Sequence, residues 1–381
     1  ALTLSAATFD NSGGASSASQ FTLHAANLVN RGGTLTQTGT GAMTLDVTGT
    51  LDNSNGTLQT NSTDLTIAPA ALDNDGGTIT HAGTGKLSVN ADNGAGAISN
   101  VGGRIATNGQ GLIQGGALNN AAGSIIGQNG LTVTVGGTLN NTNGKLLSNT
   151  DTSLTSGALN NNGGQIGAGT KETISTGSLT NSGGSIVAPD LTLSTTATLD
   201  NSSGDIEANQ LALKAADLLN RGGNITQYGA SATGFDVSGT FDNSNGGTLQ
   251  TNSTDFTLAP GALNNDGGSI IDAGTGTLTI KPGNGSGNFS NVGGKIISAG
   301  QIDAQAASLN NANGVLAAQG RIAAKIAGDL NNTQGSVRSL SSLTLASGGT
   351  LTNTNGQIQS GTGAAGDTST FGIQAAALDN T

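Results

Sequence analysis

The sequence predicts an all-β fold, a parallel β-helix (solenoid) of about 18 coils, each with ~20 residues and three short strands. Two observations predict it. An Asn is followed three positions later by Gly at seventeen places, with an apolar residue two positions before each Asn; Leu, Ile or Val stands five positions after the Asn in fifteen of them. The Asn positions are 11, 30, 53, 74, 100, 120, 141, 161, 181, 201, 220, 243, 265, 291, 311, 332 and 353, and Asn380 begins an eighteenth repeat. Such a period indicates stacked units, because one unit is too small to bury a core alone.

Composition agrees with a repeat protein and disfavours several classes of partner. Aromatic residues are 2% and charged residues 9% of the 381 residues, while Gly reaches 64. The net charge is −11 and the 12 basic residues are scattered, which disfavours nucleic acid and anionic membranes as partners. No apolar run approaches the ~18 residues of a membrane span, so we expect none. The absence of Cys excludes disulfides and thiolate metal sites.

One repeat shows how each coil is expected to fold. Strand alternation places Leu139 and Asn141 on the same inward side, so the repeat Asn should lie in the core at a corner. Gly144 is expected to supply the positive φ of the turn that follows. Leu146 then faces the core on the next strand, and a further strand lies around Leu154. The inward Asn side chains should bond neighbouring amides and buried backbone groups, as stacked Asn ladders do.

The domain organisation is predicted to be a single β-helical repeat domain over 1–381. Because the chain opens and closes within a repeat, we expect it to be a fragment of a longer protein. The Asn spacings run 19, 23, 21, 26, 20, 21 from Asn11 and 19, 23, 22, 26, 20, 21 from Asn201, which indicates an internal duplication of roughly 1–190 and 191–381. Identical words support it, namely NRGG at 30–33 and 220–223, TLQTNSTD at 57–64 and 248–255, and SNVGG at 99–103 and 290–294.

The longer coils (wide coils) differ from the others by inserted residues, which we expect at the surface. Their extra residues enter one corner as Gly-Thr-Gly inserts and, in two coils, a second corner before the next Asn. The first kind of insert lies at 39–41, 83–85, 274–276 and 361–363, and the second kind at 91–97 and 282–288. These inserts are either slack loops or a lateral contact patch that recurs along the repeats, because binding residues commonly lie on loops of a rigid scaffold.

Candidate catalytic and metal-binding groups are sparse. Asp73 and Asp75 beside Gly76 look like half of a calcium loop, but no distal Glu completes it, so we interpret them as turn residues. A polysaccharide lyase or hydrolase needs clustered carboxylates with a basic partner or a second acid. Asp52 and Asp73 could stack outward in adjacent coils, but Arg31 falls at a different corner position. We therefore predict no catalytic or metal-binding residue here.

Histidine and aromatic residues give no stronger signal. His24 and His81 occupy non-equivalent positions without a nucleophile or ligand partner, and both are predicted to be surface residues. Tyr228 and Phe235 could form a stacking platform for a sugar, but Phe235 falls in a core register, which favours packing. No cofactor, cofactor-binding residue or enzymatic activity is predicted.

The unit seen in LNNNGGQIGAGTKETISTGS (159–178) and LDNSSGDIEANQLALKAAD (199–217) resembles the haemagglutinin repeat of the filamentous haemagglutinin family, over essentially all 381 residues. The resemblance implies a right-handed β-helical filament of a two-partner-secretion exoprotein from a Gram-negative bacterium, either an adhesin or a contact-dependent growth inhibition stalk. It also implies export through an outer-membrane transporter partner, a secreted or cell-surface location, and projection of a tip or toxin toward another cell, whose receptor or glycan the sequence does not name.

Three hypotheses for function follow. The first is a structural stalk segment of a surface filament that serves adhesion or toxin delivery. The second is a segment that itself binds a receptor or glycan through the wide-coil loops at 91–97 and 282–288. The third is a carbohydrate-active β-helix enzyme.

Overall fold

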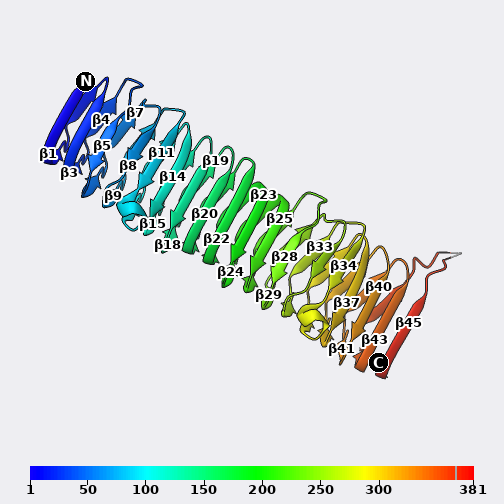
Figure 1. Ribbon diagram of the computed structural model, residues 1–381. Helices are drawn as coiled ribbons and strands as arrows, with labels where there is room; N and C mark the ends of the chain where they lie inside the picture. The colour runs from blue at the N-terminus through cyan, green and yellow to red at the C-terminus, as the bar shows by residue number, and fades with distance from the viewer. Residues whose placement is uncertain (365–366) are drawn as a thin grey trace. The chain divides into compact units, whose positions relative to one another are not determined.

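The computed structural model describes residues 1–364 and 367–381, and it is the expected all-β, right-handed parallel β-helix of about 17 turns. Its described residues form 45 strands. The coils divide into two compact units, unit 1 at Ala1–Thr192 and unit 2 at Leu193–Thr381. Within each unit, strands of successive coils lie side by side (Figure 1).

Unit 1 places its strands at three positions of the coil. The first position follows the Asn–Gly turn and holds β2 (Ala15–Ala18), β4 (Thr34–Gln37), β7 (Thr57–Thr60), β10 (Thr78–His81), β13 (Arg104–Thr107), β16 (Ser124–Gly127), β19 (Lys145–Ser148) and β21 (Gln165–Ala168). The second holds β5 (Thr44–Val47), β8 (Leu65–Ile67), β11 (Lys86–Asn90), β14 (Gln110–Gly115) and β17 (Leu131–Val135). The third holds β6 (Thr50–Asp52), β9 (Ala71–Asp73), β12 (Ala97–Ser99), β15 (Ala117–Asn119) and β18 (Thr138–Asn140). Four strands run through the second and third positions, namely β1 (Leu2–Asp10), β3 (Phe21–Val29), β20 (Thr152–Asn160) and β22 (Lys171–Thr180).

Unit 2 repeats this arrangement. The first position holds β27 (Asn224–Gln227), β30 (Thr248–Thr251), β33 (Ser269–Asp272), β36 (Lys295–Ser298), β39 (Val315–Ala318), β42 (Ser336–Ser339) and β44 (Gln357–Ser360). The second holds β28 (Gly234–Val237), β31 (Phe256–Leu258), β34 (Thr277–Ile280), β37 (Gln301–Ala306) and β40 (Ile322–Ile326). The third holds β24 (Thr198–Asp200), β26 (Asp217–Leu219), β29 (Thr240–Asp242), β32 (Ala262–Asn264), β35 (Asn288–Ser290), β38 (Ser308–Asn310) and β41 (Leu330–Asn331). The longer strands are β25 (Asp205–Ala215), β43 (Leu343–Thr352) and β45 (Phe371–Asp379), and β23 (Ser185–Thr195) has residues in both units.

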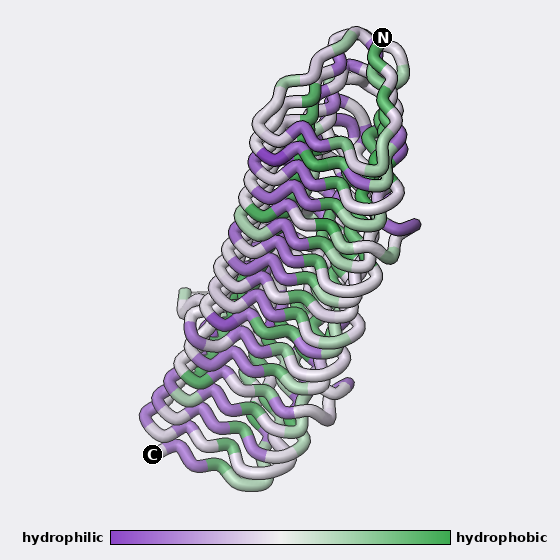
Figure 2. Tube along the Cα trace, turned by 90° about the vertical axis from the view of Figure 1, so that its left-hand side faces the viewer, coloured by the Kyte–Doolittle hydropathy of each residue, from purple (hydrophilic) through white to green (hydrophobic). Residues whose placement is uncertain are grey.

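Parallel pairing keeps equivalent repeat positions opposite one another, which builds the core as columns. Leu35 pairs with Leu58, Leu58 with Ile79, and Ile79 with Ile105, each at most 1% exposed. Because side chains alternate along a strand, every second residue joins such a column and the others face outward. Figure 2 shows this alternation as hydrophobic and hydrophilic columns that run from coil to coil.

The repeat Asn residues form a buried amide ladder in each unit, as predicted. From Asn11 to Asn161 in unit 1, each Asn Nδ2 donates to Oδ1 of the next repeat Asn at 2.6–2.7 Å, and from Asn201 to Asn353 in unit 2 it does so at 2.6–2.8 Å. The same nitrogen also reaches backbone carbonyls: Asn141 Nδ2 lies 3.3 Å from the carbonyl oxygens of Gly144 and Gln165. The ladder therefore satisfies corner carbonyls that would otherwise be buried without a donor.

The role predicted for the repeat Gly is wrong in one respect. The positive φ of the turn falls on the residue before it, as in Asn143 (φ 54°) and Gly163 (φ 63°). Gly144 is needed because a Cβ there would overlap the carbonyl oxygen of Asn120 in the preceding coil and lie 2.6 Å from Asn141 Oδ1. Close approach between coils, not backbone conformation, therefore requires the Gly.

The residue before each ladder Asn caps the same turn. Asp10, Asp52, Asp73, Asn140 and Asn160, for example, each accept a hydrogen bond through Oδ1 from the backbone N–H two positions ahead, at 2.9–3.1 Å. Such Asx turns explain why Asp and Asn recur there.

Candidate functional site

The wide-coil inserts are ordered parts of the solenoid. Residues Ala91–Gly94 and Pro282–Gly285 each form a short 3-10 turn (η1 and η2), in which Asp92, Asn93, Gly283 and Asn284 have positive φ between 44° and 54°. Ala91 is fully buried, and Pro282 is also buried. Asp92 N and Gly283 N donate to the carbonyls of Pro69 and Pro260, at 2.8 and 2.6 Å, which fastens each turn to a neighbouring coil.

The Gly-Thr-Gly corners pack closely as well. A Cβ on Gly83 would overlap the Ser62 carbonyl oxygen, and one on Gly274 would overlap that of Ser253. At 83–85 and 274–276 the insert therefore lies against the preceding coil and is not a slack loop. A lateral contact role for the wide coils stays a prediction.

Arg31, expected to lie at a different corner position, pairs with Asp52 and covers its carboxylate. Asp52 is 6% exposed, and Arg31 Nε lies 2.6 Å from its Oδ2. Burial raises its pKa, but hydrogen bonds from Ser54 and Arg31 outweigh burial and hold the pKa below its usual value. Arg221 and Asp242 repeat the pair in unit 2 at 2.7 Å. Asp73 is opposite Asp52 in register.

The pair Asp73 and Asp75 serves turns, as predicted. Asp75 Oδ1 accepts hydrogen bonds from Ser99 Oγ at 2.5 Å and from Val101 N at 2.8 Å. Asp266 does the same in unit 2 with Ser290 and Val292. Among the described residues there is no group of three or more His, Cys, Asp or Glu that could hold a metal ion.

The two histidines differ. His24 lies at the surface, as predicted, with Nδ1 3.1 Å from Asp46 Oδ2. His81 is fully buried, so its prediction as a surface residue is wrong. Its Nδ1 lies 2.8 Å from Thr107 Oγ1 and its Nε2 lies 2.9 Å from the Ser62 carbonyl oxygen. Burial lowers the pKa of His81, which keeps the ring neutral and hydrogen-bonded.

Phe235 is half-buried and packs against core residues, in the register that the sequence predicted. Its ring meets Phe241 and Phe256 edge to face, with centroids 5.1 and 5.9 Å apart. Tyr228 stays 51% exposed, and its hydroxyl donates to Glu207 Oε2 at 3.1 Å. The two aromatic residues therefore do not form a common platform.

Two buried acids were missed by the sequence analysis. Glu172 is fully buried in a core column opposite Thr152, and neither carboxylate oxygen has a hydrogen-bond partner of normal geometry among the described residues. Burial raises its pKa well above the usual value, opposed by the Thr152 hydroxyl. Asp272 is 1% exposed and lies 3.3 Å from Ser298 Oγ; burial raises its pKa to about 6.

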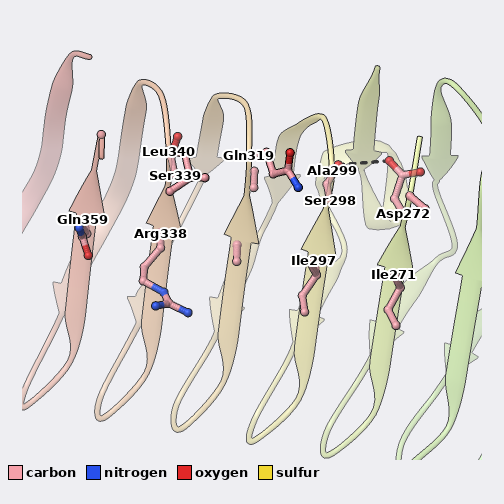
Figure 3. A pocket seen from close by; sticks show the side chains of 14 residues that line it. Ile271, Asp272, Ile297, Ser298, Ala299, Gln319, Arg338, Ser339, Leu340 and Gln359 are labelled. Carbon is pink, nitrogen blue, oxygen red and sulfur yellow. Dashed lines mark hydrogen bonds between the residues drawn. The ribbon is translucent and has the colours of Figure 1, made fainter. Parts of the chain in front are cut away.

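A groove lies on the surface of unit 2. It has a volume of about 470 Å³ and follows the ends of the first-position strands β33, β36, β39, β42 and β44 and their turns. Parallel register aligns one outward side chain from each strand, in the order Ile271, Ile297, Ala317, Arg338 and Gln359. Figure 3 shows Ile271, Ile297 and Arg338 projecting from the strands, with Asp272 and Ser298 joined by a hydrogen bond nearer the strand ends.

The hollow arises from differences in side-chain size. Ala317 lies between the larger Ile297 and Arg338 in the outward column, and Ala299 is small at the adjoining turn. Leu340 completes the groove and is 55% exposed, while Ile297 is 41% exposed. The surface therefore combines an apolar hollow with one exposed guanidinium.

A second hollow, of about 300 Å³, lies on the third-position strands of unit 1. Its lining is mostly small, including Ala71, Ala97 and Ala117, and Asp73 is its one charged residue. It lacks the large exposed apolar side chains of the unit 2 groove. No described helix is long and apolar enough to cross a membrane.

Comparison with known proteins assigns the fold to a family. The haemagglutinin repeat family matches residues 1–55, 44–84, 82–143, 131–203 and 206–245, which is more than half of the chain. The chain belongs to the haemagglutinin repeat family. Its matches cover coils with the Asn ladder and the buried columns described above.

A curated relative extends the comparison. The chain is 56% identical over 351 residues to a protein of Burkholderia pseudomallei (strain 1026b) named tRNA nuclease CdiA-2. That match covers 91% of the chain but only 11% of the relative, so the chain spans a small part of its length. No solved structure matches the chain.

Proposed function

We propose that the chain is a rigid stalk segment of a secreted or cell-surface exoprotein, which projects an adhesive or toxin-delivering tip toward other cells. The observation that supports this most is the continuity of the coils, since buried columns and the Asn ladder leave each coil held by its neighbours. A repeat of this kind lengthens by copying coils and needs no catalytic group. Membership of the haemagglutinin repeat family and the similarity to CdiA-2 agree with it.

The proposal includes partners and location. We infer export through an outer-membrane two-partner-secretion transporter of a Gram-negative bacterium, an extracellular location, and a receptor or glycan on the target cell. The nuclease activity in the relative's name belongs to that much longer protein, and we assign no catalytic, cofactor-binding or metal-binding role to this chain.

The internal duplication offers a clean test in the full-length protein. Deleting residues 30–219 joins Val29 to Asn220. Because NRGG stands at both 30–33 and 220–223, the sequence after Val29 is still NRGG, and the repeat Asn keeps its place in the coil. The deletion removes nine coils, which should shorten the reach by about 40 Å at ~4.8 Å per coil. Electron microscopy of the purified full-length protein measures this change.

A stalk predicts normal secretion and preserved attachment or toxin delivery at the shorter reach. Loss of target-cell binding by a secreted, folded deletion protein would instead favour direct recognition by the removed coils. Saturable binding of the 381-residue chain alone to target cells would also contradict a purely spacing role.

A further inference from the structure

The two copies differ at one corner in a way that a spacer does not require. Eight residues after the ladder Asn, three repeats of unit 1 carry Asn108, Gln128 and Asn149, and the equivalent repeats of unit 2 carry Ala299, Gln319 and Leu340. Asn108 Nδ2 donates to the Ala82 carbonyl at 2.9 Å, a bond that Ala299 has no side-chain donor to make. At two of these three repeats an apolar side chain therefore stands where unit 1 has a polar one.

The apolar part of the groove matches a large hydrophobic side chain. Ile297 and Leu340 are both exposed and flank the hollow above Ala317. Apolar pockets of this kind take an anchoring side chain, because burial removes apolar surface of both partners from water.

Arg338 gives the groove its charge selectivity. It is exposed, and no ion pair or hydrogen bond of its side chain is found among the described residues, whereas Arg31 and Arg221 each hold an Asp. The other charged lining residue, Asp272, is buried and turned toward Ser298 and the Gly274 N–H. On a chain of net charge −11, this exposed guanidinium favours a carboxylate, which it can bind through two parallel hydrogen bonds.

The shape of the groove favours an extended peptide. It crosses five coils, or about 19 Å at the interstrand spacing, which is the length of about six extended residues. No aromatic ring lines it for a sugar to stack on. The strand backbones there already pair with coils on both sides, so recognition must use side chains and not strand addition.

We propose that this groove binds an extended peptide segment of a partner protein in which a large aliphatic or aromatic side chain stands next to Asp or Glu. The apolar side chain fills the hollow beside Ala317, and the carboxylate pairs with Arg338. This role goes beyond spacing, and the deletion of residues 30–219 leaves every groove residue in place.

The test selects, from a displayed library of random seven-residue peptides, those that bind the 381-residue chain. Peptides that also bind the Ala299→Asn, Leu340→Asn double variant are removed by counter-selection. That variant restores the residues that unit 1 carries, so the fold should tolerate it. Enriched peptides should contain Leu, Ile, Phe or Met beside Asp or Glu. Fluorescence anisotropy should show at least about tenfold weaker binding to the double variant and to Arg338→Gln.

A matched control is Val187→Asn, which removes an apolar side chain that is 42% exposed on the corresponding outward column of unit 1. It should leave the dissociation constant unchanged. Circular dichroism and melting check each fold, and Arg338→Gln alone suffices should the double variant unfold. The proposal is overturned if no peptide sequence is enriched, if the enriched peptides are basic, or if they bind the variants as tightly as the wild type. It is also overturned if a glycan array shows binding of a sugar that depends on Arg338 and Leu340 while no peptide binds.

Discussion

Asn141 Nδ2 donates to Asn161 Oδ1 at 2.7 Å, although the two residues are 20 positions apart in the sequence. Both are fully buried. Asn161 in turn donates to Asn181 at 2.7 Å and to the carbonyl oxygens of Gly164 and Ser185. One side chain thus joins three consecutive coils.

Replacing Asn161 by Ala should lower the free energy of unfolding by about 1–3 kcal/mol, because buried backbone and amide groups lose their partner. Chemical denaturation at neutral pH measures the change. Asn149→Ala serves as the control, since its amide is at the surface, and it should cost less than about 0.5 kcal/mol. Equal stability of the two variants would contradict the role of the ladder.

Gly144 and Asn143 should respond oppositely to substitution. Gly144→Ala forces a methyl group onto the Asn120 carbonyl and should cost about 1–3 kcal/mol or more. Asn143→Gly should be nearly neutral, because Asn143 already holds a φ of 54° that Gly adopts freely. Thermal melting of both variants tests the distinction, and a tolerated Gly144→Ala would refute the close approach.

Asp272 should make stability depend on pH. Its pKa rises from 3.8 when unfolded to about 6 when folded, so the folded state binds the proton more tightly. The stabilisation is fully present below pH 3.8 and is lost as pH rises through 6. The free energy of unfolding of Asp272→Asn should therefore be higher than that of the wild type at pH 8, by up to about 3 kcal/mol. Near pH 4 the two values should be equal.

Denaturation curves across pH 4–8 measure this difference. The pH dependence that His81 contributes has the opposite sign. Because its pKa is lowered by burial, His81 reduces the stability of the fold only as pH falls below 6.5. A wild-type stability that does not change between pH 4 and 6, or an Asn variant that is less stable than the wild type at pH 8, would show that burial does not raise the pKa of Asp272.

Glu172 should be dispensable for stability. Its carboxyl group lies in a column whose earlier members include Leu131, and burial favours its protonated form. Glu172→Leu should raise stability by about 1–4 kcal/mol at pH 8, where the wild type is least stable, and by less at pH 4. Glu172→Gln, which removes the charge and keeps the shape, separates the electrostatic gain from the packing gain. A loss of stability in both variants would show that a group within the fold stabilises the Glu172 carboxylate.

The repeat period and the alternation of side chains were enough to predict the coils, the inward Asn residues and the core register of Phe235. The burial of His81 was also within reach, because His81 lies two residues after the core residue Ile79 and so faces the same way. Its polarity suggested the surface, but the Ser62 carbonyl and the Thr107 hydroxyl satisfy it inside.

Features that depend on contacts between coils could not be predicted from single-repeat patterns. The need for Gly144 comes from a carbonyl 24 residues earlier, and the Arg31–Asp52 pair bridges neighbouring coils. The groove depends on side-chain sizes from five coils at once. A comparison of matching repeats in the two halves would have pointed to it, because Ala299 and Leu340 stand where the first half has Asn108 and Asn149.

The spacing of the ladder bonds also bears on the order of folding. Within each unit, the Asn–Asn ladder bonds join residues only 19 to 27 positions apart, so no described ladder contact waits for a distant part of the polypeptide. Chains dominated by such local contacts fold quickly and can grow outward from any formed nucleus. A polypeptide that emerges end first from a narrow opening could thus acquire its final form one turn at a time, each completed turn serving as the template for the next.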